Sequence, residues 1–571
     1  LALGSCAQVP TTPEVDKPSQ TPAQTAKPVT SLGMYELNIN GVGEKQLQAS
    51  VSRPGMSAQA AEISGLKFDL LSNATTADNV KRILHIATSF TVTNTTAQTI
   101  TLPTFIPVDT DGAYSTDGET PFRNVVTRKG TPISGSNIRI EKAYQMSGGV
   151  VAEDPNATPL VDGLDTGALQ LSLPAGTTAP GISHQGWQTA TLAPGASQVV
   201  NFAMRVPLQG ADVGDNDPFR FSLVFAVADN PGTVNLTNVA SVQGATPAGN
   251  VATPLNTQSV MVEGVVTSVT PGLSGFFVQE EGIDADADAN TSNGVFVYCA
   301  ASCPAVTTNS RVRVTGTAAE FSGATQLTNP TVTVLASGVP APAPVALTLP
   351  LDKAQLERYE GMRVSFPETL TVTNNYTYGR YGQLDLSNNG RIFNPTNGNA
   401  KTGQSTITLD DGISAQNPLN LNYLGSENTR RTGDTVTGLM GIWHAVANLP
   451  MLEPEGPVNF VSANSRAANA QPKDVGGSLK VGGANVLNYF TTYGSSADRG
   501  ANNTTELQRQ RTKMANNLVT LNADVLTLME VQNNGDTALN DLVAALNEKA
   551  GAGTYAAVKT GTVGTDAIKV A

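Results

Sequence analysis

The sequence predicts a multidomain, mostly β protein that ends in an α/β segment. A chain of 571 residues is too long for a single core and suggests about three to five domains. Only 14% of the residues are charged, whereas 54 are Gly and 34 are Pro, a composition typical of short strands joined by turns. Hydrophobic residues make up 40% of the chain, enough for packed cores, and no apolar run is long enough for a transmembrane helix.

Charge is unevenly distributed along the chain. The formal net charge is −13, yet the segment from Gln471 onward carries nine basic and nine acidic residues. The 25 basic and 38 acidic residues upstream therefore account for the whole net charge. Because an acidic surface repels a polyanion, any nucleic-acid chemistry is expected at the C-terminal end.

The first thirty residues contain a candidate lipidation site. In "LALGSCAQ", the residues Leu3-Gly4-Ser5 followed by Cys6 resemble the bacterial lipobox, in which the cysteine is lipidated. The Pro-, Thr-, Gln- and Ser-rich stretch that follows, up to residue 30, predicts a disordered tether. The lipobox implies an exported cell-envelope lipoprotein anchored through Cys6, or an extracellular protein; the alternative is a chance buried cysteine in a loop.

Residues 31–232 predict a β-sandwich, because "RILHIATSFTVTN" and "QVVNFAMRVPL" alternate apolar and polar residues between turns. No acid–base pair or nucleophile stands out in this module. The stretch "SHQGW", with His184 and Trp187, is interpreted as ordinary packing. Residues 233–257 are polar and predict a linker.

Residues 258–338 contain five short strand patterns with an early V-x-G-x-V motif, which resembles an OB-fold barrel. The spacing "GFFVQ…NGVFVYC…VRVTGTAAEF" also resembles the OB-like domain of YhcR-type secreted nucleases. Between the strands, Asp284, Asp286 and Asp288 alternate, so they could converge on Ca²⁺. Ala289 and Val295 stand where an EF-hand has Gly and Glu, and an acidic solvated loop is the alternative.

Cys299 and Cys303 form a C-x3-C pair, which in an exported protein predicts a small disulfide loop. Zinc would need two further ligands, and none of the three histidines is near in sequence.

Residues 342–462 predict a second OB-like or other β module after a stiff proline linker. Tyr376, Tyr378 and Tyr381, with Arg380 among them, could form a stacking surface for single-stranded nucleic acid. Aromatic side chains that alternate on a strand also pack within sheets, and both interpretations stay open.

After a linker at 463–475, residues 476–571 change to alternating β and α patterns. "SLKVGGANVLNYF" predicts a strand and "ADVLTLME" a buried strand, and "TYAAVK" and "DAIKVA" are further strand candidates. Two helices are predicted between them, one capped by Thr504 or Thr505 and one capped by Asp536. The strand "DVLTLME" is unusual because it ends on a carboxylate, Glu530.

The run "ANVLNYF…RGANNTTELQRQRTKM…LNADVLTLMEVQNNG…GTDAIKVA" resembles the N-terminal part of the endonuclease/exonuclease/phosphatase fold, a four-layer α/β sandwich. It is most similar to the secreted ExeM/NucH-type nucleases, relatives of deoxyribonuclease I, and the resemblance covers roughly residues 258–571. It implies that Asn485 and Glu530 hold a divalent metal, Mg²⁺ or Mn²⁺, beside the scissile phosphate of DNA, with RNA as an open alternative. Asp566 falls near a substrate-contact region of the family. The family usually has an aromatic residue where this chain has Ala484, and a charged one where it has Gln532.

This chemistry is physically reasonable. Phosphodiester hydrolysis needs a Lewis acid for the developing charge and a general base for the attacking water. One carboxylate and one amide at neighbouring strand ends fit Mg²⁺, but no histidine follows His444. The family's catalytic His and Asp residues are therefore expected beyond Ala571, and the polypeptide alone is expected to be almost inactive. The alternatives are an adhesion or scaffold lipoprotein and a phosphatase of the same superfamily.

Overall fold

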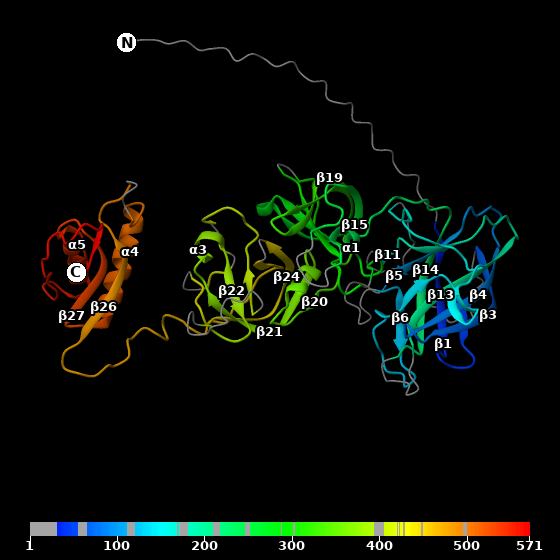
Figure 1. The fold of residues 1–571 in the computed structure, drawn as a ribbon, viewed down its shortest axis with the longest axis horizontal. Helices are drawn as coiled ribbons and strands as arrows, with labels where there is room; N and C mark the ends of the chain where they lie inside the picture. Colours follow the sequence, from blue (N-terminus) through cyan, green and yellow to red (C-terminus); the bar gives the residue numbers. More distant parts are fainter. Residues whose placement is uncertain are drawn as a thin grey trace, which may run out of the picture. The chain divides into compact units, whose positions relative to one another are not determined.

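The computed structural model describes residues 31–571 except for 55–64, 111–119, 168, 170, 172–180, 209–216, 246–251, 287, 301–302, 393–404, 419–420, 422, 426–428, 447–448 and 495–498. It contains 43% strand and 10% helix, which confirms a mostly β protein. The chain forms two compact units, Leu1–Val461 and Ser462–Ala571 (Figure 1). Within the described ranges, no helix is long and apolar enough to cross a membrane.

Two sheets with a shared core form the first module. The larger sheet follows the order β10-β12-β5-β14-β1-β2, with β11 on β5 and β6 on β14. Its strands are β1 (Ser31–Asn40), β2 (Gln48–Ser52), β5 (Thr104–Asp109), β6 (Phe122–Val126), β10 (Leu160–Val161), β11 (Gly181–Ile182), β12 (Gly186–Gln188) and β14 (Arg220–Ala228). The smaller sheet, ordered β3-β4-β13-β7, consists of β3 (Leu66–Asp78), β4 (Ile83–Asn94), β7 (Arg139–Glu141) and β13 (Ser197–Pro207). A separate hairpin joins β8 (Tyr144–Ser147) and β9 (Val150–Glu153).

Aromatic side chains connect the two sheets. Phe202 of β13 lies 5.1 Å, centroid to centroid, from Phe225 of β14. Trp187 packs edge-on against Phe202 and donates its indole N–H to the Glu141 carbonyl at 3.0 Å. Because the indole is buried and its one polar group is satisfied, Trp187 is a core residue.

The second module is a closed five-stranded barrel ordered β15-β16-β17-β19-β18 (Figure 1). Its elements are β15 (Ser259–Thr270), the 3-10 turn η1 (Pro271–Leu273), β16 (Gly275–Gln279), β17 (Gly294–Tyr298), β18 (Ser310–Phe321) and β19 (Ala324–Ser337). The stretch expected to be a polar linker contains the short helix α1 (Val239–Gln243), whose Val239 and Val242 are fully buried in the barrel core. The linker prediction is wrong at this point, because these two valines complete the barrel core.

The third module repeats the same strand order. It contains β20 (Val345–Ala346), α2 (Lys353–Arg358), β21 (Arg363–Asn374), α3 (Tyr378–Tyr381), β22 (Leu384–Ser387), β23 (Thr406–Leu409), β24 (Thr435–Val446) and β25 (Leu449–Pro454). The pairings run β21-β22-β23-β25-β24 and return to β21, and the β23–β25 pair is parallel, as β17–β19 is in the first barrel. The backbones of the two barrels touch where a Cβ added to Gly294 would lie 2.3 Å from the Gly361 carbonyl carbon, so only glycine fits there.

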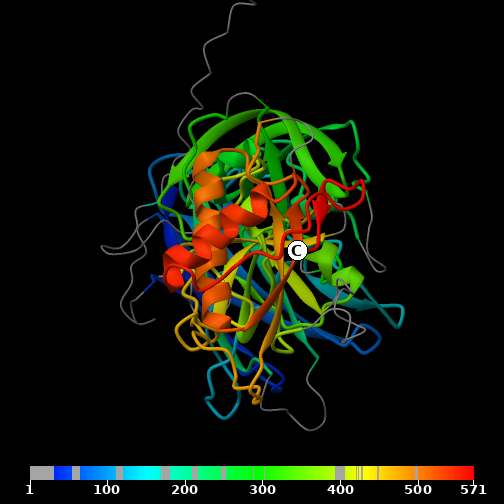
Figure 2. The same ribbon diagram turned by 90° about the vertical axis from the view of Figure 1, so that its left-hand side faces the viewer.

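The C-terminal unit has a three-stranded sheet ordered β26-β27-β28 and two helices. Its elements are β26 (Val481–Tyr489), α4 (Thr504–Leu521), β27 (Val525–Gln532), α5 (Thr537–Ala550) and β28 (Ile568–Lys569). Figure 2 shows α4 and α5 side by side, and their apolar stripes form one core with β26 and β27. "TYAAVK" forms no strand, and "DAIKVA" contributes only the two residues of β28.

Only one face of β27 is buried. Leu528 and Val531 belong to the core, whereas Val525 is 49% exposed and Met529 36%. The prediction of a strand was correct, but the prediction that it is buried holds for one face only. The apolar run is divided between a core-facing row and an exposed row.

Candidate metal site at the ends of two parallel strands

Asn485 and Glu530 lie at the carboxyl ends of neighbouring strands. Strands β26 and β27 are parallel, and their register runs from Val481 opposite Val525 to Asn485 opposite Met529. The carboxyl ends of parallel strands meet at one edge of a sheet, where α/β proteins place their ligands. The regular pairing breaks after Asn485 and resumes where Tyr489 lies opposite Val531.

The two side chains touch directly. The Asn485 amide Nδ2 donates to Glu530 Oε1 at 2.7 Å, and the Asn488 backbone N–H donates to Glu530 Oε2 at 3.0 Å. Asn485 Oδ1 accepts the backbone N–H of Leu487 at 2.8 Å. Asn485 therefore holds the Glu530 carboxylate in place in the structure.

The backbone around this pair adopts an uncommon conformation. Glu530 has φ 66°, and Leu487 and Asn488 have φ 54° and 49°. Left-handed residues other than glycine cost on the order of 1–3 kcal/mol each and persist only where surrounding contacts impose them. Gln510 of α4 supplies such contacts, because its Nε2 donates to the carbonyls of Val486 and Leu487 at 2.9 and 2.7 Å.

Gln532 holds the backbone around the pair in place. Its Oε1 accepts the Thr491 backbone N–H at 2.9 Å and the Asn534 Nδ2 at 2.9 Å, and its Nε2 donates to the Thr492 hydroxyl. These bonds join the segment after β26 to the loop after Glu530. Gln532 is 9% exposed, so it acts on the shape of the loop rather than on a ligand.

The Glu530 carboxylate keeps lone pairs that a metal ion could use. Each Glu530 oxygen accepts one hydrogen bond in the structure, and a carboxylate offers about four lone-pair positions. Mg²⁺ is held in many enzymes by one or two carboxylates, several waters and substrate phosphate. No group of three His, Cys, Asp or Glu side chains arranged to hold a metal occurs in the described part of the chain. A Mg²⁺ or Mn²⁺ ion that keeps much of its water would suit these residues, and Glu530 would be the carboxylate that could hold it.

Asp566 is not part of this pair. Its carboxylate forms an ion pair with Arg499, and its carbonyl accepts the Asn533 Nδ2 at 2.9 Å. The Arg499 guanidinium holds the pKa of the Asp566 carboxyl below its usual value. Asp566 thus closes the loop beyond Glu530 and has no direct contact with the metal-site pair in the structure.

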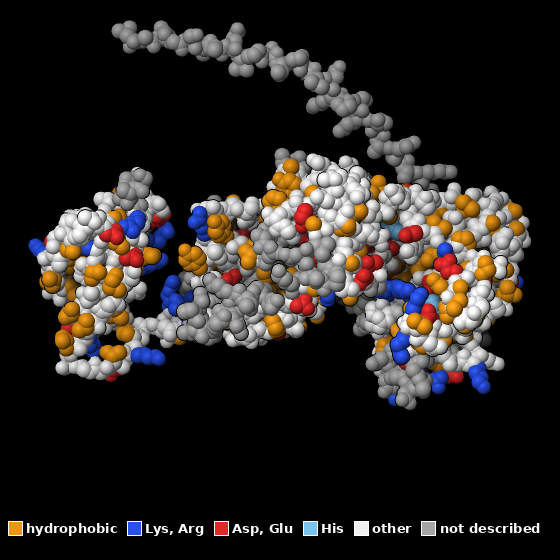
Figure 3. All heavy atoms as spheres, in the orientation of Figure 1, with side chains coloured by type: hydrophobic (Ala, Val, Ile, Leu, Met, Phe, Trp, Pro, Cys, Tyr) orange, Lys and Arg blue, Asp and Glu red, His pale blue; other side chains and the backbone are white. Residues whose placement is uncertain are grey.

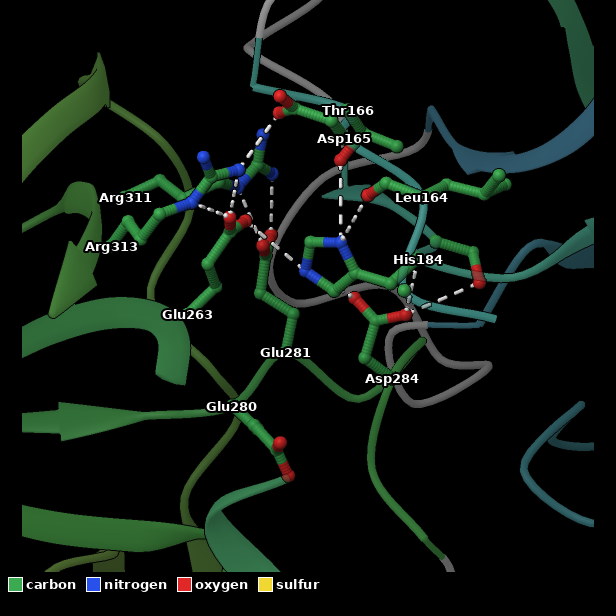
Figure 4. Close-up of polar contacts among 12 residues, drawn as sticks. Leu164, Asp165, Thr166, His184, Glu263, Glu280, Glu281, Asp284, Arg311 and Arg313 are labelled. Atoms are coloured by element: carbon green, nitrogen blue, oxygen red, sulfur yellow. Dashed lines mark hydrogen bonds and ion pairs between the residues drawn. The ribbon is translucent and has the colours of Figure 1, made fainter. Parts of the chain in front are cut away.

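The three aspartates proposed for Ca²⁺ do not converge. Asp284 turns to the first module, where its Oδ1 accepts the His184 backbone N–H at 2.7 Å and the Ser183 hydroxyl at 3.2 Å (Figure 4). Asp286 and Asp288 instead accept hydrogen bonds from Thr291 and Asn290 within their own loop. The spacing of two residues between the aspartates did not predict their orientation, because Asp284 bonds to His184, which lies 100 residues away in the sequence.

His184 lies at the centre of this polar network rather than in ordinary packing. Its Nε2 is 3.3 Å from Glu263 Oε2 and 3.5 Å from Asp284 Oδ2, as Figure 4 shows. Glu263 also pairs with Arg313, which reaches Asp165 at 2.8 Å, and Arg311 pairs with Glu281 at 2.6 Å. The network joins the two-sheet module to the first barrel.

The contact between these two modules is expected to weaken as the pH rises. Burial alone lowers the pKa of His184, but the Asp284 and Glu263 carboxylates outweigh burial and raise it above 6.5. A histidine with a raised pKa contributes stability that is complete below about pH 6.5 and is lost as the pH rises through the raised value. Hydrogen exchange at the His184 amide should therefore be slower at pH 6 than at pH 8, after correction for intrinsic rates. His184→Asn should remove the difference; a wild-type protein with no difference would contradict the prediction.

The four residues proposed as a stacking surface do not share one face. Tyr376 is 90% exposed, but Tyr378 is 5% exposed and stacks on Tyr423 in the core of the second barrel. Arg380 lies over the Tyr381 ring at 5.4 Å and donates to Gln416. The segment forms the short helix α3 where a strand was expected, so the alternation that suggested a shared face is absent.

Two of the three cysteines lie in the described part of the chain, and the third does not. Cys299 and Cys303 form a disulfide with a Cα–Cα distance of 4.9 Å. Cys6 and the tether up to residue 30 lie outside the described residues.

Comparison with known proteins does not assign the chain to a family. No family model matches the sequence, and no curated protein matches it. A function for the chain is therefore inferred from the geometry of its structure.

Proposed function

We propose that this chain is an exported, metal-dependent nuclease that hydrolyses phosphodiester bonds of DNA, with RNA as a second possible substrate. The observation that carries the proposal is the contact of Asn485 and Glu530 at the ends of two parallel strands. Glu530 is the proposed ligand of Mg²⁺ or Mn²⁺, and Asn485 is the proposed positioning residue. A bound divalent metal would neutralise charge that develops on the phosphate.

The charge of the C-terminal unit is compatible with a polyanionic substrate. From Gln471 onward, basic and acidic residues are equal in number, and both kinds are interspersed on the face drawn in Figure 3. The upstream modules carry the whole net charge of −13 and would repel DNA more strongly. We therefore assign substrate binding to the unit that also carries Glu530.

The same proposal assigns a fold to each module of the chain. The strand order shared by the two barrels supports an OB-like fold for both. We interpret the two-sheet module as a β-sandwich and the C-terminal unit as the N-terminal part of an endonuclease/exonuclease/phosphatase domain. The Cys299–Cys303 disulfide supports export to an oxidising compartment, with lipid attachment proposed at Cys6.

Metal-dependent binding of DNA tests the assignment. We expect Mn²⁺ to raise the affinity of the chain for a short DNA duplex at least about tenfold, because a bound metal adds a direct contact to phosphate. Glu530→Gln should abolish this increase. Asp524→Asn is the matched control, since Asp524 stands at the other end of β27 and accepts the Lys480 backbone N–H. Equal DNA affinity with and without metal would contradict the proposal.

The residues from Ser462 to Ala571 include no histidine, so the unit does not supply an imidazole base. We expect plasmid nicking by the 571-residue chain in Mg²⁺ to be slow or undetectable even where metal binding is intact. Rapid magnesium-dependent nicking that Glu530→Gln abolishes would support the metal site and overturn the expectation of low activity.

A further inference from the structure

A groove lined with aromatic side chains lies on the outer face of the first barrel. Its volume of about 440 Å³ falls in the range of roughly 300–1,000 Å³ typical of ligand sites. Strands β16 and β17 and the tip of the β18–β19 hairpin form most of it, and part of the second barrel closes one side. The described residues that line it include neither Asn485 nor Glu530, and neither His184 nor the residues paired with it.

Strand alternation places the aromatic rings in the groove. On β17, Val295 and Val297 are fully buried in the barrel core, so Phe296 and Tyr298 between and after them face outward. Phe296 lies opposite Phe277 of β16, with ring centroids 4.9 Å apart. The groove therefore has an aromatic floor.

Two further rings are accessible to a ligand. Tyr298 is 37% exposed, and Phe321, at the hairpin tip, is 63% exposed. Both line the groove, and exposed aromatic side chains that cluster around a concavity typically mark a binding site.

The second barrel shows that the fold does not require these rings. Its strands β22 and β23 hold the places of β16 and β17, and their outward residues are polar, with Asp385 opposite Thr408. The Thr408 hydroxyl donates to the Asp385 carboxylate at 3.0 Å. The two barrels share a strand order but differ in the outward face of this strand pair. Phe277, Phe296 and Tyr298 lie on β16 and β17, whereas the outward residues of β22 and β23 are polar.

The charge of the groove favours a neutral ligand. No Lys or Arg is among the described residues that line it, whereas sites for single-stranded nucleic acid combine aromatic rings with a basic groove. His444 is the only imidazole among these lining residues, and burial lowers its pKa to about 4, so it is uncharged at neutral pH. A polyanion would find no cation here.

Polar groups in the groove suit a ligand that carries hydroxyls. Glu360 is 3% exposed, and its Oε1 accepts the Thr325 backbone N–H at 3.0 Å. Its Oε2 is buried and has no hydrogen-bond partner in the structure. Gln326, opposite Phe296 on β19, adds an amide that can both donate and accept.

We propose that this groove binds a neutral oligosaccharide whose sugar rings stack on Tyr298 and Phe321 and whose hydroxyls bond to Gln326 and Glu360. The C–H faces of sugar rings are apolar and pack on aromatic rings, while their hydroxyls need donors and acceptors at the edge. The corresponding face of OB-type barrels binds oligosaccharides as well as oligonucleotides. The inference does not depend on the proposed nuclease function.

Titration calorimetry with three neutral hexasaccharides, cellohexaose, maltohexaose and chitohexaose, tests the proposal on the full chain in EDTA, which removes any contribution of the metal site. We expect at least one of them to bind with a Kd of roughly 10 μM to 1 mM. Phe321→Ala and Tyr298→Ala should weaken it at least about tenfold, and Phe321→Trp should retain it, because tryptophan keeps the stacking face.

Tyr376→Ala is the matched control, because Tyr376 is a 90% exposed aromatic residue that does not line the groove. Its sugar affinity should equal that of the wild type. Absence of binding for all three hexasaccharides would overturn the proposal. Binding of a dT dodecamer that Phe321→Ala weakens, without sugar binding, would overturn it in favour of a nucleic-acid site.

Discussion

Replacing Glu530 with glutamine is expected to lower the affinity of the chain for Mn²⁺ at least about 100-fold, because the site has a single carboxylate and glutamine removes its charge. The change preserves the shape of the side chain. Its amide can still accept from Asn485 and Asn488, although only through one oxygen. Titration of Mn²⁺ monitored by electron paramagnetic resonance gives the free-ion concentration directly.

Asn485→Ala provides a graded comparison with this variant. Asn485 positions the carboxylate but does not supply its charge. Its loss should therefore lower the affinity for Mn²⁺ about 10–100-fold, the usual effect of losing a residue that positions a metal ligand. Asp524→Asn should leave the affinity unchanged. If Glu530→Gln binds Mn²⁺ as tightly as the wild type, Glu530 is not the ligand.

Replacing Lys569 with methionine is expected to destabilise the C-terminal unit by about 2–4 kcal/mol, since hydrogen bonds to a buried charged group are among the stronger ones. The Lys569 side chain is 1% exposed. Its ammonium donates to the carbonyls of Gly535 and Gly561 at 2.8 and 2.7 Å, and to the Asp536 carboxylate at 3.2 Å. Methionine fills the space but leaves these acceptors without their donor.

Lys559→Met is the matched control, because Lys559 is an exposed lysine in the same unit. Its effect on the free energy of unfolding should stay within about 0.5 kcal/mol. Urea unfolding of both variants, followed by circular dichroism, gives the comparison. Equal stabilities would show that the buried ammonium contributes nothing to the closure of the loop after Glu530.

Local patterns predicted the elements that carry the site. The 3.6-residue stripe of α5 and the strand that carries Glu530 appear where the sequence indicated them, but β27 does not end on Glu530 and runs on to Gln532. The start of α4 was misassigned by one or two residues: the cap is Asn503, whose side chain accepts the Glu506 backbone N–H at 3.0 Å, rather than Thr504 or Thr505. Asn and Thr both cap helices, so composition alone does not choose between adjacent candidates.

Asp536 also differs from its predicted role. It stands at the N-cap position of α5 but makes no capping hydrogen bond there, because its carboxylate accepts from Lys569 and from the Gly561 backbone N–H instead. The Asn534 side chain accepts the Ala538 backbone N–H at 3.1 Å. Contacts with Gly561 and Lys569 draw the Asp536 side chain away from the helix, and the local pattern does not encode them.

Features that depend on distant contacts could not be predicted. The turn of Asp284 to His184 and the burial of Tyr378 on Tyr423 both require knowledge of the tertiary structure. The aromatic groove gave a readable signal, the alternating Phe296 and Tyr298 of "GVFVYC", but alternation does not show whether the outward face is covered. Asn485 and Glu530 were predicted as ligands of one metal, and the structure places their side chains in direct contact at 2.7 Å; the metal itself stays a prediction.

Anomalous diffraction from crystals of the chain soaked in Mn²⁺ tests the central claim most directly. We predict an anomalous peak about 2.0–2.2 Å from a carboxylate oxygen of Glu530, with water in most of the remaining coordination positions. The peak should be absent from Glu530→Gln crystals. A peak at the Asp284–Asp288 loop, with none at Glu530, would contradict the account.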